Sequence, residues 1–334
     1  MRIGLIGCGW IAETHLESLA VLGEEVVCVC DPDPQRLRWA VGATGAEGFA
    51  DWHSLLERGR PEAVLVLTPP RLHREVTLAA FERGLPVYLE KPVARDLADA
   101  QAIVDVAERT RAVCAIGYQW RAVEWIAPLR ELVAARELGL VAVRMVGSTS
   151  GRTWFTDQAA GGGQVLERAS HGIDLVQAIA GPAVRVSGSG ANVPLAGPDR
   201  PPASEIDDVL ALTLELERGA IATVSVVWQR PELPRTYEID VIGDGARVTG
   251  VLDPEFRATG IADGVPVDLR SGPPTRLGME RFLAAARAGD PGGVACTPRE
   301  ATASLASASG PDRAHAPAAG ARTRGPAPRV RGYG

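Results

Sequence analysis

Short apolar runs alternate with helix-like segments through the first 120 residues. Five runs rich in β-branched residues are typical of buried strands, and they cover residues 2–6, 25–30, 63–68, 85–90 and 112–118. Helical periodicity lies between them, and several of these segments begin at an Asp or Thr cap: 11–22, 33–42, 51–58, 72–83 and 96–110. Alternating β and α units predict an α/β fold with a doubly wound parallel sheet.

The pattern changes after residue 120. A helical segment at 122–136 leads to an apolar run at 141–149, a glycine-rich loop and a second helix at about 163–180. Alternating apolar and polar positions then predict strands at 208–216, 220–228, 235–243, 246–252 and 265–269. We therefore expect a C-terminal α+β domain with a large, mostly antiparallel open sheet, one face of which is free to meet a partner subunit.

The C-terminal residues have a different composition. Thr297 and Glu300 form a capping box, but the helix that they begin runs into a stretch rich in Pro, Ala, Gly and Arg. This composition is typical of a disordered tail. A solvated basic extension, an interaction arm and a reading-frame change that replaced a normal helix all remain open. The predicted divisions are 1–120, 121–303 and a tail at 304–334.

Composition and charge exclude several classes of function. The 334 residues, 46% of them hydrophobic and 23% charged, suit a soluble globular protein. A net charge of −6 argues against nucleic-acid binding. We see neither a signal peptide nor an apolar run of the roughly 18 residues that span a membrane. The five cysteines show no CxxC pair or zinc spacing, so we expect no metal site and a cytoplasmic location.

A glycine-rich turn follows the first predicted strand. The segment GCGWIA places Gly7, Gly9 and Ala12 in the G-x-G-x-x-G/A arrangement, which allows a tight turn and a close approach to a pyrophosphate. The second strand ends at Asp31, 24 residues after Gly7, where an acid binds the adenosine ribose and repels a 2′-phosphate. The motif predicts a Rossmann domain over residues 1–120 that binds NAD.

Alternatives remain for both features. The glycines can form a structural turn that binds no nucleotide, and Asp31 can be a turn former before Pro32. Arg36 and Arg38 follow closely enough that NADP is not excluded.

Lys91 is the only lysine, because the other residues in the combined count of 35 Lys and Arg are arginines. It lies in VYLEKPVA, at the carboxyl end of the strand predicted at 85–90, which is the edge where open α/β sheets bind ligands. An ammonium can shift its pKa, whereas a guanidinium stays charged. The position therefore indicates a chemical role for Lys91, with a stray surface lysine as the alternative.

Six segments carry a resemblance to a known family. GCGWIA, VCDPD, TPPRLH, VYLEKPVA, GYQWR and GGGQVLERASHGIDL follow one another within the first 180 residues. Together they resemble the glucose–fructose oxidoreductase, inositol dehydrogenase and MocA (Gfo/Idh/MocA) family. The resemblance implies that Lys91 is catalytic. In this family the proline after that lysine often has a cis peptide bond, which would be Lys91–Pro92 here.

The resemblance also implies a second catalytic pair in the second domain. It places Glu167 where many members have Asp, and His171 four residues later. On a helix these side chains share a face, so Glu167 is expected to orient His171 and raise its basicity. Asp174 shares that face from the other side and is expected to have a helix-surface or supporting role, and His15 is expected to be packed or solvated.

Further contacts follow from the motifs. Cofactor-binding residues are expected at the glycine loop and the strand ends: Gly7, Gly9, Trp10, Ile11, Ala12, Asp31, Thr68, Pro69, His73, Glu90, Lys91 and Gln119. Substrate contacts are expected at Arg121, Arg152, Trp154, Arg168 and Tyr237.

The residue types fit the oxidation of a secondary alcohol. His171 suits a general base, and Lys91 suits a donor to the developing alkoxide or a proton relay. We expect an NAD(P)-dependent oxidoreductase that acts on a sugar, cyclitol or related polyol, as a homodimer or homotetramer joined through the second-domain sheet. A redox-neutral NAD-dependent glycoside hydrolase and a non-catalytic nucleotide-binding regulator are the alternatives. The identity of the substrate does not follow from the sequence.

Overall fold

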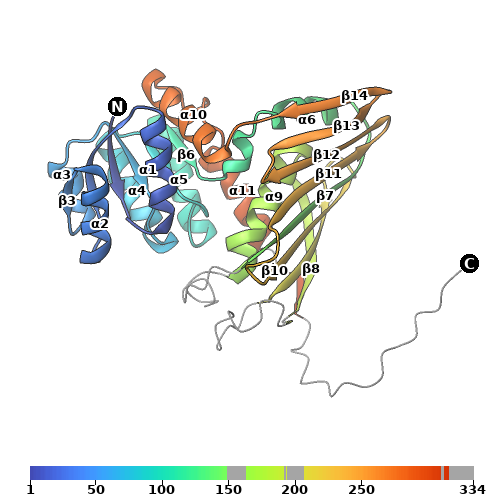
Figure 1. Ribbon diagram of the computed structural model, residues 1–334, viewed down its shortest axis with the longest axis horizontal. Coiled ribbons are helices and arrows are strands. Elements are labelled where there is room, and N and C mark those ends of the chain that lie inside the picture. The colour runs from blue at the N-terminus through green and yellow to red at the C-terminus, as the bar shows by residue number, and fades with distance from the viewer. Residues whose placement is uncertain (149–162, 192, 194–206, 310–311, 316–334) are drawn as a thin grey trace, which may run out of the picture.

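Two sheets lie side by side in the computed structural model, each with its own helices (Figure 1). The structure describes residues 1–148, 163–191, 193, 207–309 and 312–315. Within them the first sheet has six parallel strands in the order β3-β2-β1-β4-β5-β6. Their bounds are β1 (Arg2–Ile6), β2 (Glu25–Cys30), β3 (Glu47–Phe49), β4 (Ala63–Val66), β5 (Val87–Leu89) and β6 (Cys114–Ile116). This order confirms the doubly wound sheet, with the reversal of strand order between β1 and β4.

The helices of the first sheet begin where the sequence offers a cap. The side chains of Asp33, Asp51 and Asp96 each accept a backbone N–H of the helix that follows. The helices are α1 (Trp10–Val21), α2 (Pro34–Thr44), α3 (Trp52–Arg58), η1 (Pro70–Leu72), α4 (His73–Glu82) and α5 (Leu97–Thr110). Strand β3 was not predicted, because it is a three-residue edge strand in which only Phe49 is buried.

The second sheet is larger. Its order is β14-β13-β12-β11-β7-β10-β9-β8-β15, and all pairs are antiparallel except β7–β10 and β8–β15. The strands are β7 (Leu138–Ser148), β8 (Ala183–Ala191), β9 (Val209–Leu216), β10 (Ile221–Gln229), β11 (Thr236–Gly243), β12 (Ala246–Asp253), β13 (Arg257–Ala262), β14 (Val265–Arg270) and β15 (Asp312–His315). The mostly antiparallel sheet is thus confirmed. The sequence missed β8, β13 and β15, of which β8 is rich in the weak strand formers Gly and Ser.

The remaining helices connect the two sheets. They are η2 (Gln119–Ala122), α6 (Ile126–Ala134), η3 (Val165–Ala169), α9 (Ser170–Ala180), α10 (Pro274–Ala288) and α11 (Pro298–Ser309). Within the described residues, none of the helices is long and apolar enough to cross a membrane. Figure 1 shows α9 and α11 between the sheets and α10 beside the first sheet.

The cores do not divide at residue 120. Phe282 and Leu283 of α10 pack with Ile3 and Leu5 of the first sheet, and α11 contributes Leu305 to its other core cluster. The prediction placed these segments in the second domain, but in the structure α10 and part of α11 pack in the core of the first domain. Helix α11 also continues to Ser309, past the predicted start of the tail at 304, because Ala and Leu favour helix and its inner face is buried.

A buried ion-pair network joins η2, α9 and α11. The guanidinium of Arg121 donates two hydrogen bonds to the carboxylate of Asp174, at 2.7 and 2.9 Å, and a third to Glu300 at 2.7 Å. The hydroxyl of Ser304 also donates to Asp174, at 2.8 Å. Arg121 is 9% exposed and Asp174 is 2% exposed. The predicted substrate contact of Arg121 is therefore not found, since its charge is used to hold three elements together.

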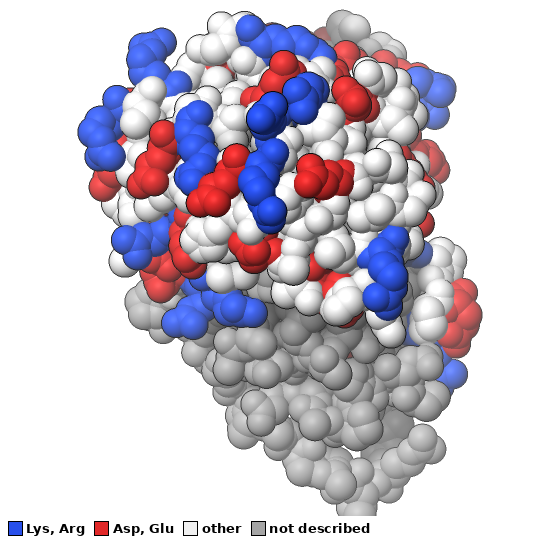
Figure 2. Space-filling view, turned by 90° about the vertical axis from the view of Figure 1, so that its left-hand side faces the viewer, with Lys and Arg blue, Asp and Glu red and all other residues white. Residues whose placement is uncertain are grey.

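Surface charge on the first domain is mixed. Figure 2 shows this face, where Arg side chains lie among Asp and Glu side chains. Exposed ion pairs among the described residues include Arg299–Glu108, at 2.6 Å. Such pairs stabilise a fold by at most about 1 kcal/mol each.

The buried network predicts a large cost when one partner is removed. Asp174→Ala leaves the Arg121 guanidinium buried beside a single carboxylate, so we expect the free energy of unfolding to fall by about 3–5 kcal/mol. Urea unfolding followed by circular dichroism measures it. The matched control is Asp268→Ala, which breaks an exposed pair with Arg257 and is expected to change the free energy of unfolding far less. Equal costs for the two variants would contradict this assignment.

Candidate active site

The glycine loop leaves room for a ligand at the end of β1. Gly7 has a φ of +99°, and a Cβ there would lie 2.8 Å from the backbone of Leu67, so only glycine fits. A Cβ on Gly9 would meet no atom within 4 Å. Gly9 precedes α1, and no side chain caps that helix. The open space and the uncapped N–H groups fit a dinucleotide pyrophosphate.

Asp31 stabilises this loop from the end of β2. Its carboxylate accepts the backbone N–H of Cys8 at 2.8 Å and that of Asp33 at 2.8 Å. The second of these bonds is the turn contact that the sequence left open as an alternative. The contact with Cys8 was not predicted, and it ties β2 to the glycine loop. A hydrogen bond from Asp31 to a ribose stays a prediction.

Glu90 and His15 form a buried pair behind the lysine. Nε2 of His15 lies 2.9 Å from a carboxylate oxygen of Glu90, and the other oxygen accepts the backbone N–H of Lys91 at 3.1 Å. Burial raises the pKa of Glu90, but the hydrogen bond and charge of His15 and the charge of Lys91 outweigh it, so the pKa is lowered overall. Glu90 therefore holds the backbone at Lys91. His15 is packed, which was one of the two environments predicted for it.

His73 joins the two loops that follow β4 and β5. Its ring is fully buried, with one nitrogen 2.8 Å from the carbonyl oxygen of Thr68 and the other 2.9 Å from that of Pro92. The predicted cofactor contact does not fit this geometry, because both ring nitrogens face the backbone. The hydroxyl of Thr68, by contrast, is buried with no hydrogen-bond partner among the described residues. It offers a polar group beside the glycine loop.

Lys91 crosses from the first domain to the second. Its Nζ lies 2.7 Å from a carboxylate oxygen of Glu167 and donates to the Glu167 carbonyl oxygen at 2.8 Å. The side chains of Lys91 and Glu167 are 11% and 16% exposed. The Lys91–Pro92 peptide bond is cis. An ammonium has three N–H donors, so one remains for a substrate oxygen.

Glu167 lies in a π-helical turn, η3, instead of the expected α-helix. Because π-helical hydrogen bonds join residues five apart, side chains four apart no longer lie one above the other. The carboxylate of Glu167 binds Lys91, and the charges that shift the pKa of His171 are those of Lys91 and Arg168. The expectation that Glu167 orients His171 and raises its basicity is therefore not met.

His171 lies at the start of α9 within an aromatic frame. The ring of Tyr118 meets it edge-on at 5.6 Å, and that of Trp120 lies 5.3 Å away. Burial lowers the pKa of His171 well below its usual range, and the charges of Lys91 and Arg168 lower it further. The imidazole is thus neutral at neutral pH and able to accept a proton. Sequence reasoning missed both aromatic residues as site residues, and their only signal is the GYQWR segment after β6.

Arg168 and Tyr237 lie on the second-domain side of the site. Arg168 donates to the Tyr237 hydroxyl at 2.9 Å and to the Ser148 carbonyl oxygen at 3.2 Å. The Tyr237 ring lies 5.5 Å from Trp120, which links this pair to His171. Two residues that were predicted to contact the substrate therefore lie near His171.

Three other predicted residues have different outcomes. The amide oxygen of Gln119 accepts the hydroxyl of Thr275 at the start of α10. Arg152 and Trp154 lie outside the described residues. Within the described residues, no cluster of three or more His, Cys, Asp and Glu is placed to hold a metal ion.

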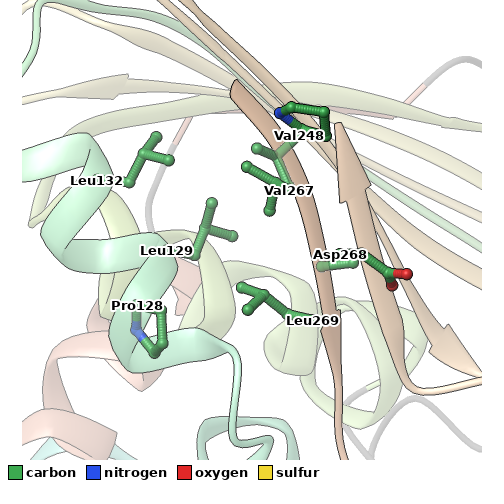
Figure 3. Close-up of a pocket in the computed structure, with 9 residues that line it drawn as sticks. Pro128, Leu129, Leu132, Val248, Val267, Asp268 and Leu269 are labelled. Atoms are coloured by element: carbon green, nitrogen blue, oxygen red, sulfur yellow. The ribbon is translucent and has the colours of Figure 1, made fainter. Parts of the chain in front are cut away.

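A separate apolar cavity of about 310 Å³ lies between α6 and strands β12 to β14 (Figure 3). Leu129 and Leu132 of α6 lie opposite Val267 and Leu269 of β14. None of the predicted site residues that the structure describes lines it. The cavity is therefore not part of the Lys91 site.

Comparison with known proteins supports the two halves of the chain separately. Residues 1–118 match the oxidoreductase family with an NAD-binding Rossmann fold, GFO_IDH_MocA, and residues 126–249 match the GFO/IDH/MocA C-terminal domain. Inositol 2-dehydrogenase 4 from Saccharopolyspora erythraea is 28% identical over 237 residues, 68% of this chain and 66% of that protein. Inositol 2-dehydrogenase from Arthrobacter sp. (strain FB24) is 34% identical over 143 residues, 42% of each. The chain thus spans less than two thirds of the length of these relatives.

Solved structures share the fold over nearly the whole chain. The WlbA dehydrogenase from Bordetella pertussis, solved with NADH and UDP-GlcNAcA, has a TM-score of 0.74 and 24% identity over 92% of this chain and 93% of that one. Levoglucosan dehydrogenase, solved with NADH and levoglucosan, has a TM-score of 0.79 and 16% identity over 92% and 97%. At these identities the likeness shows the fold alone.

The surroundings of His171 predict how its pKa responds to substitution. Both Lys91→Met and Arg168→Gln remove a positive charge that disfavours the imidazolium, so each is expected to raise the pKa of His171. Burial remains, so we expect the value to stay below the usual 6.5 or so. Titration of the imidazole signals by NMR measures the shift, and Arg299→Gln, an exposed arginine on α11, is the control. An unchanged pKa in both site variants would show that these charges do not act on His171.

Proposed function

The chain belongs to the Gfo/Idh/MocA oxidoreductase family, and from that premise we propose that it transfers a hydride between a nicotinamide cofactor and a secondary alcohol of a sugar, cyclitol or related polyol. One observation carries the proposal: Lys91 from the first domain reaches the second-domain segment that holds Glu167 and His171. Glu167 binds Lys91 at 2.7 Å, and the charge of Lys91 acts on His171.

The first domain has the features that hold a dinucleotide. Gly7 and Gly9 shape the loop, Trp10, Ile11 and Ala12 open α1, and Asp31, Thr68 and Pro69 follow the neighbouring strands. The open space at Gly9 and the unpartnered Thr68 hydroxyl fit the cofactor. NAD supplies a hydride acceptor when bound. We infer that NAD is preferred to NADP, since the carboxylate of Asp31 repels a 2′-phosphate.

The side chains divide the work of moving the proton. A neutral His171 accepts the proton of the substrate hydroxyl group while the C–H bond of the same substrate carbon gives up the hydride. The third N–H of Lys91 donates to the same oxygen as negative charge develops there. Glu167 positions the ammonium and balances its charge. Glycoside hydrolysis without net redox change would use the same groups, and accumulation of NADH distinguishes the two reactions.

We further propose a homodimer formed through the second sheet. Figure 1 shows the described helices on one face of this sheet only. The other face carries two aliphatic rows: Val146, Val227 and Val209, paired across β7, β10 and β9, and Leu140 with Ile221 and Ile242. Ile221 is 39% exposed and Ile242 is 36% exposed. Polar and charged side chains such as Thr223, Arg144 and Glu238 lie between the two rows, and such a mixture of apolar and polar side chains is found in subunit interfaces.

A reducing compartment such as the cytoplasm fits the cysteines. All five are free and buried, and burial raises the pKa of Cys8, in the glycine loop, to about 12. Cys8 is therefore a thiol and not a nucleophile.

Lys91 substitutions test the assigned chemistry. We expect Lys91→Met to lower kcat on the best substrate of a polyol panel by about 10²- to 10⁴-fold, because the oxyanion loses its donor. Lys91→Arg is expected to fail as well, since a guanidinium does not reproduce the compact ammonium. NADH absorbance measures turnover, and calorimetry checks that NAD still binds. Turnover within tenfold of wild type in Lys91→Met would refute the role of Lys91.

The proposed dimer has its own test. Val227→Arg places a charge in the middle of the open face, and we expect it to convert a dimer or tetramer to monomers in analytical ultracentrifugation. Val21→Arg, at an exposed valine at the end of α1, is the matched control and should not change the mass. A monomeric wild type, or no effect of Val227→Arg, would count against this interface.

A further inference from the structure

The guanidinium of Arg168 is not balanced by a carboxylate in the described part of the chain. Its two hydrogen-bond acceptors are neutral, the hydroxyl of Tyr237 at 2.9 Å and the carbonyl of Ser148 at 3.2 Å. The side chain is half-buried, and it is close enough to His171 for its charge to act on the imidazole. A cation withdrawn from water without a counter-ion costs free energy.

Two cations near Arg168 are each paired with a carboxylate. Lys91 is paired with Glu167 at 2.7 Å, and Arg235, which also lies over the Tyr237 ring, is paired with Asp253 at 2.8 Å. His171 is neutral. Of these three cations, Arg168 is the one without a paired carboxylate among the described residues.

The protein makes room for this arginine. A Cβ at Gly147 on β7 would lie 2.8 Å from Nη1 of Arg168 and 2.9 Å from the Tyr237 hydroxyl oxygen. The glycine thus leaves the space in which the two side chains meet. Because the Tyr237 oxygen accepts from Arg168, its own O–H is free to donate. The guanidinium and the phenol together offer several donors to one anion.

From this arrangement we propose that Arg168, with Tyr237, binds a carboxylate of the substrate, so that the enzyme acts on a sugar acid or another polyol acid. The planar guanidinium matches a carboxylate with two parallel hydrogen bonds. The ligand carboxylate supplies the missing negative charge and fixes which hydroxyl group reaches Lys91 and His171. This inference rests on the proposed dehydrogenase function and names its substrate class.

Binding to the NADH-loaded protein tests the proposal without turnover. With a reduced cofactor no alcohol is oxidised, so affinity is measured even if the proposed reaction is wrong. Calorimetry compares D-glucuronate, D-galacturonate and D-gluconate with D-glucose and D-galactose, and with D-glucose 6-phosphate as a phosphate source. We expect at least one acid to bind roughly 10- to 100-fold more tightly than its neutral counterpart, as charge-assisted hydrogen bonds do.

Variants assign that preference to Arg168. Arg168→Gln is expected to abolish the preference for the acid while leaving NADH affinity unchanged, and Arg168→Lys is expected to retain part of it. Arg299→Gln is the matched control on the surface, and circular dichroism checks that each variant is folded.

Several outcomes would overturn the proposal. Acids that bind no more tightly than neutral sugars, or that do not bind at millimolar concentration, would show that Arg168 does not bind a substrate carboxylate. Tighter binding of D-glucose 6-phosphate than of any acid would assign the site to phosphate. Loss of NADH affinity in Arg168→Gln would assign Arg168 to the cofactor.

Discussion

The buried contact between Arg121 and Asp174 is the constraint on which the site depends. Arg121 follows the last strand of the first sheet, Asp174 lies on the helix that carries His171, and Glu300 and Ser304 come from the C-terminal helix. A guanidinium with three hydrogen bonds to carboxylates has a fixed direction, so this contact sets how the two sheets meet. Lys91 follows a strand of the first sheet and His171 lies on α9, which packs against the second sheet, so their relative position depends on this contact.

Charge within the site is distributed by pairing and burial. Glu167 balances Lys91 and takes two of its three donors, which directs the third. Burial and the neighbouring cations keep His171 neutral, so a base and a donor stand together without a charge on the base. An imidazolium in the same place would repel Lys91 and could not accept a proton. The guanidinium of Arg168, which donates to two neutral oxygens, is the basis for proposing an acidic substrate.

The features that short stretches of sequence determine were predicted correctly. The bounds of β1 and β2 follow from continuous apolar runs, and the glycine loop and Lys91 follow from motifs that lie within a few residues. Strands β3, β8, β13 and β15 are short, polar or at an edge, and pairing with neighbours holds them where composition does not. The return of α10 and α11 to the first core is a long-range event. So are the partners of Arg121 and Glu167, because they depend on a π-turn and on docking between sheets, neither of which has a signature in the sequence.

The central claim is that Lys91, held by Glu167, and a neutral His171 act on one hydroxyl group. A crystal structure of the protein with NAD and its tightest-binding substrate tests this most directly, because it shows which side chains contact the reacting oxygen. We expect this oxygen to lie within hydrogen-bond distance of both Lys91 Nζ and the His171 ring, with Glu167 still bound to Lys91. A reacting hydroxyl group that contacts neither side chain would contradict it.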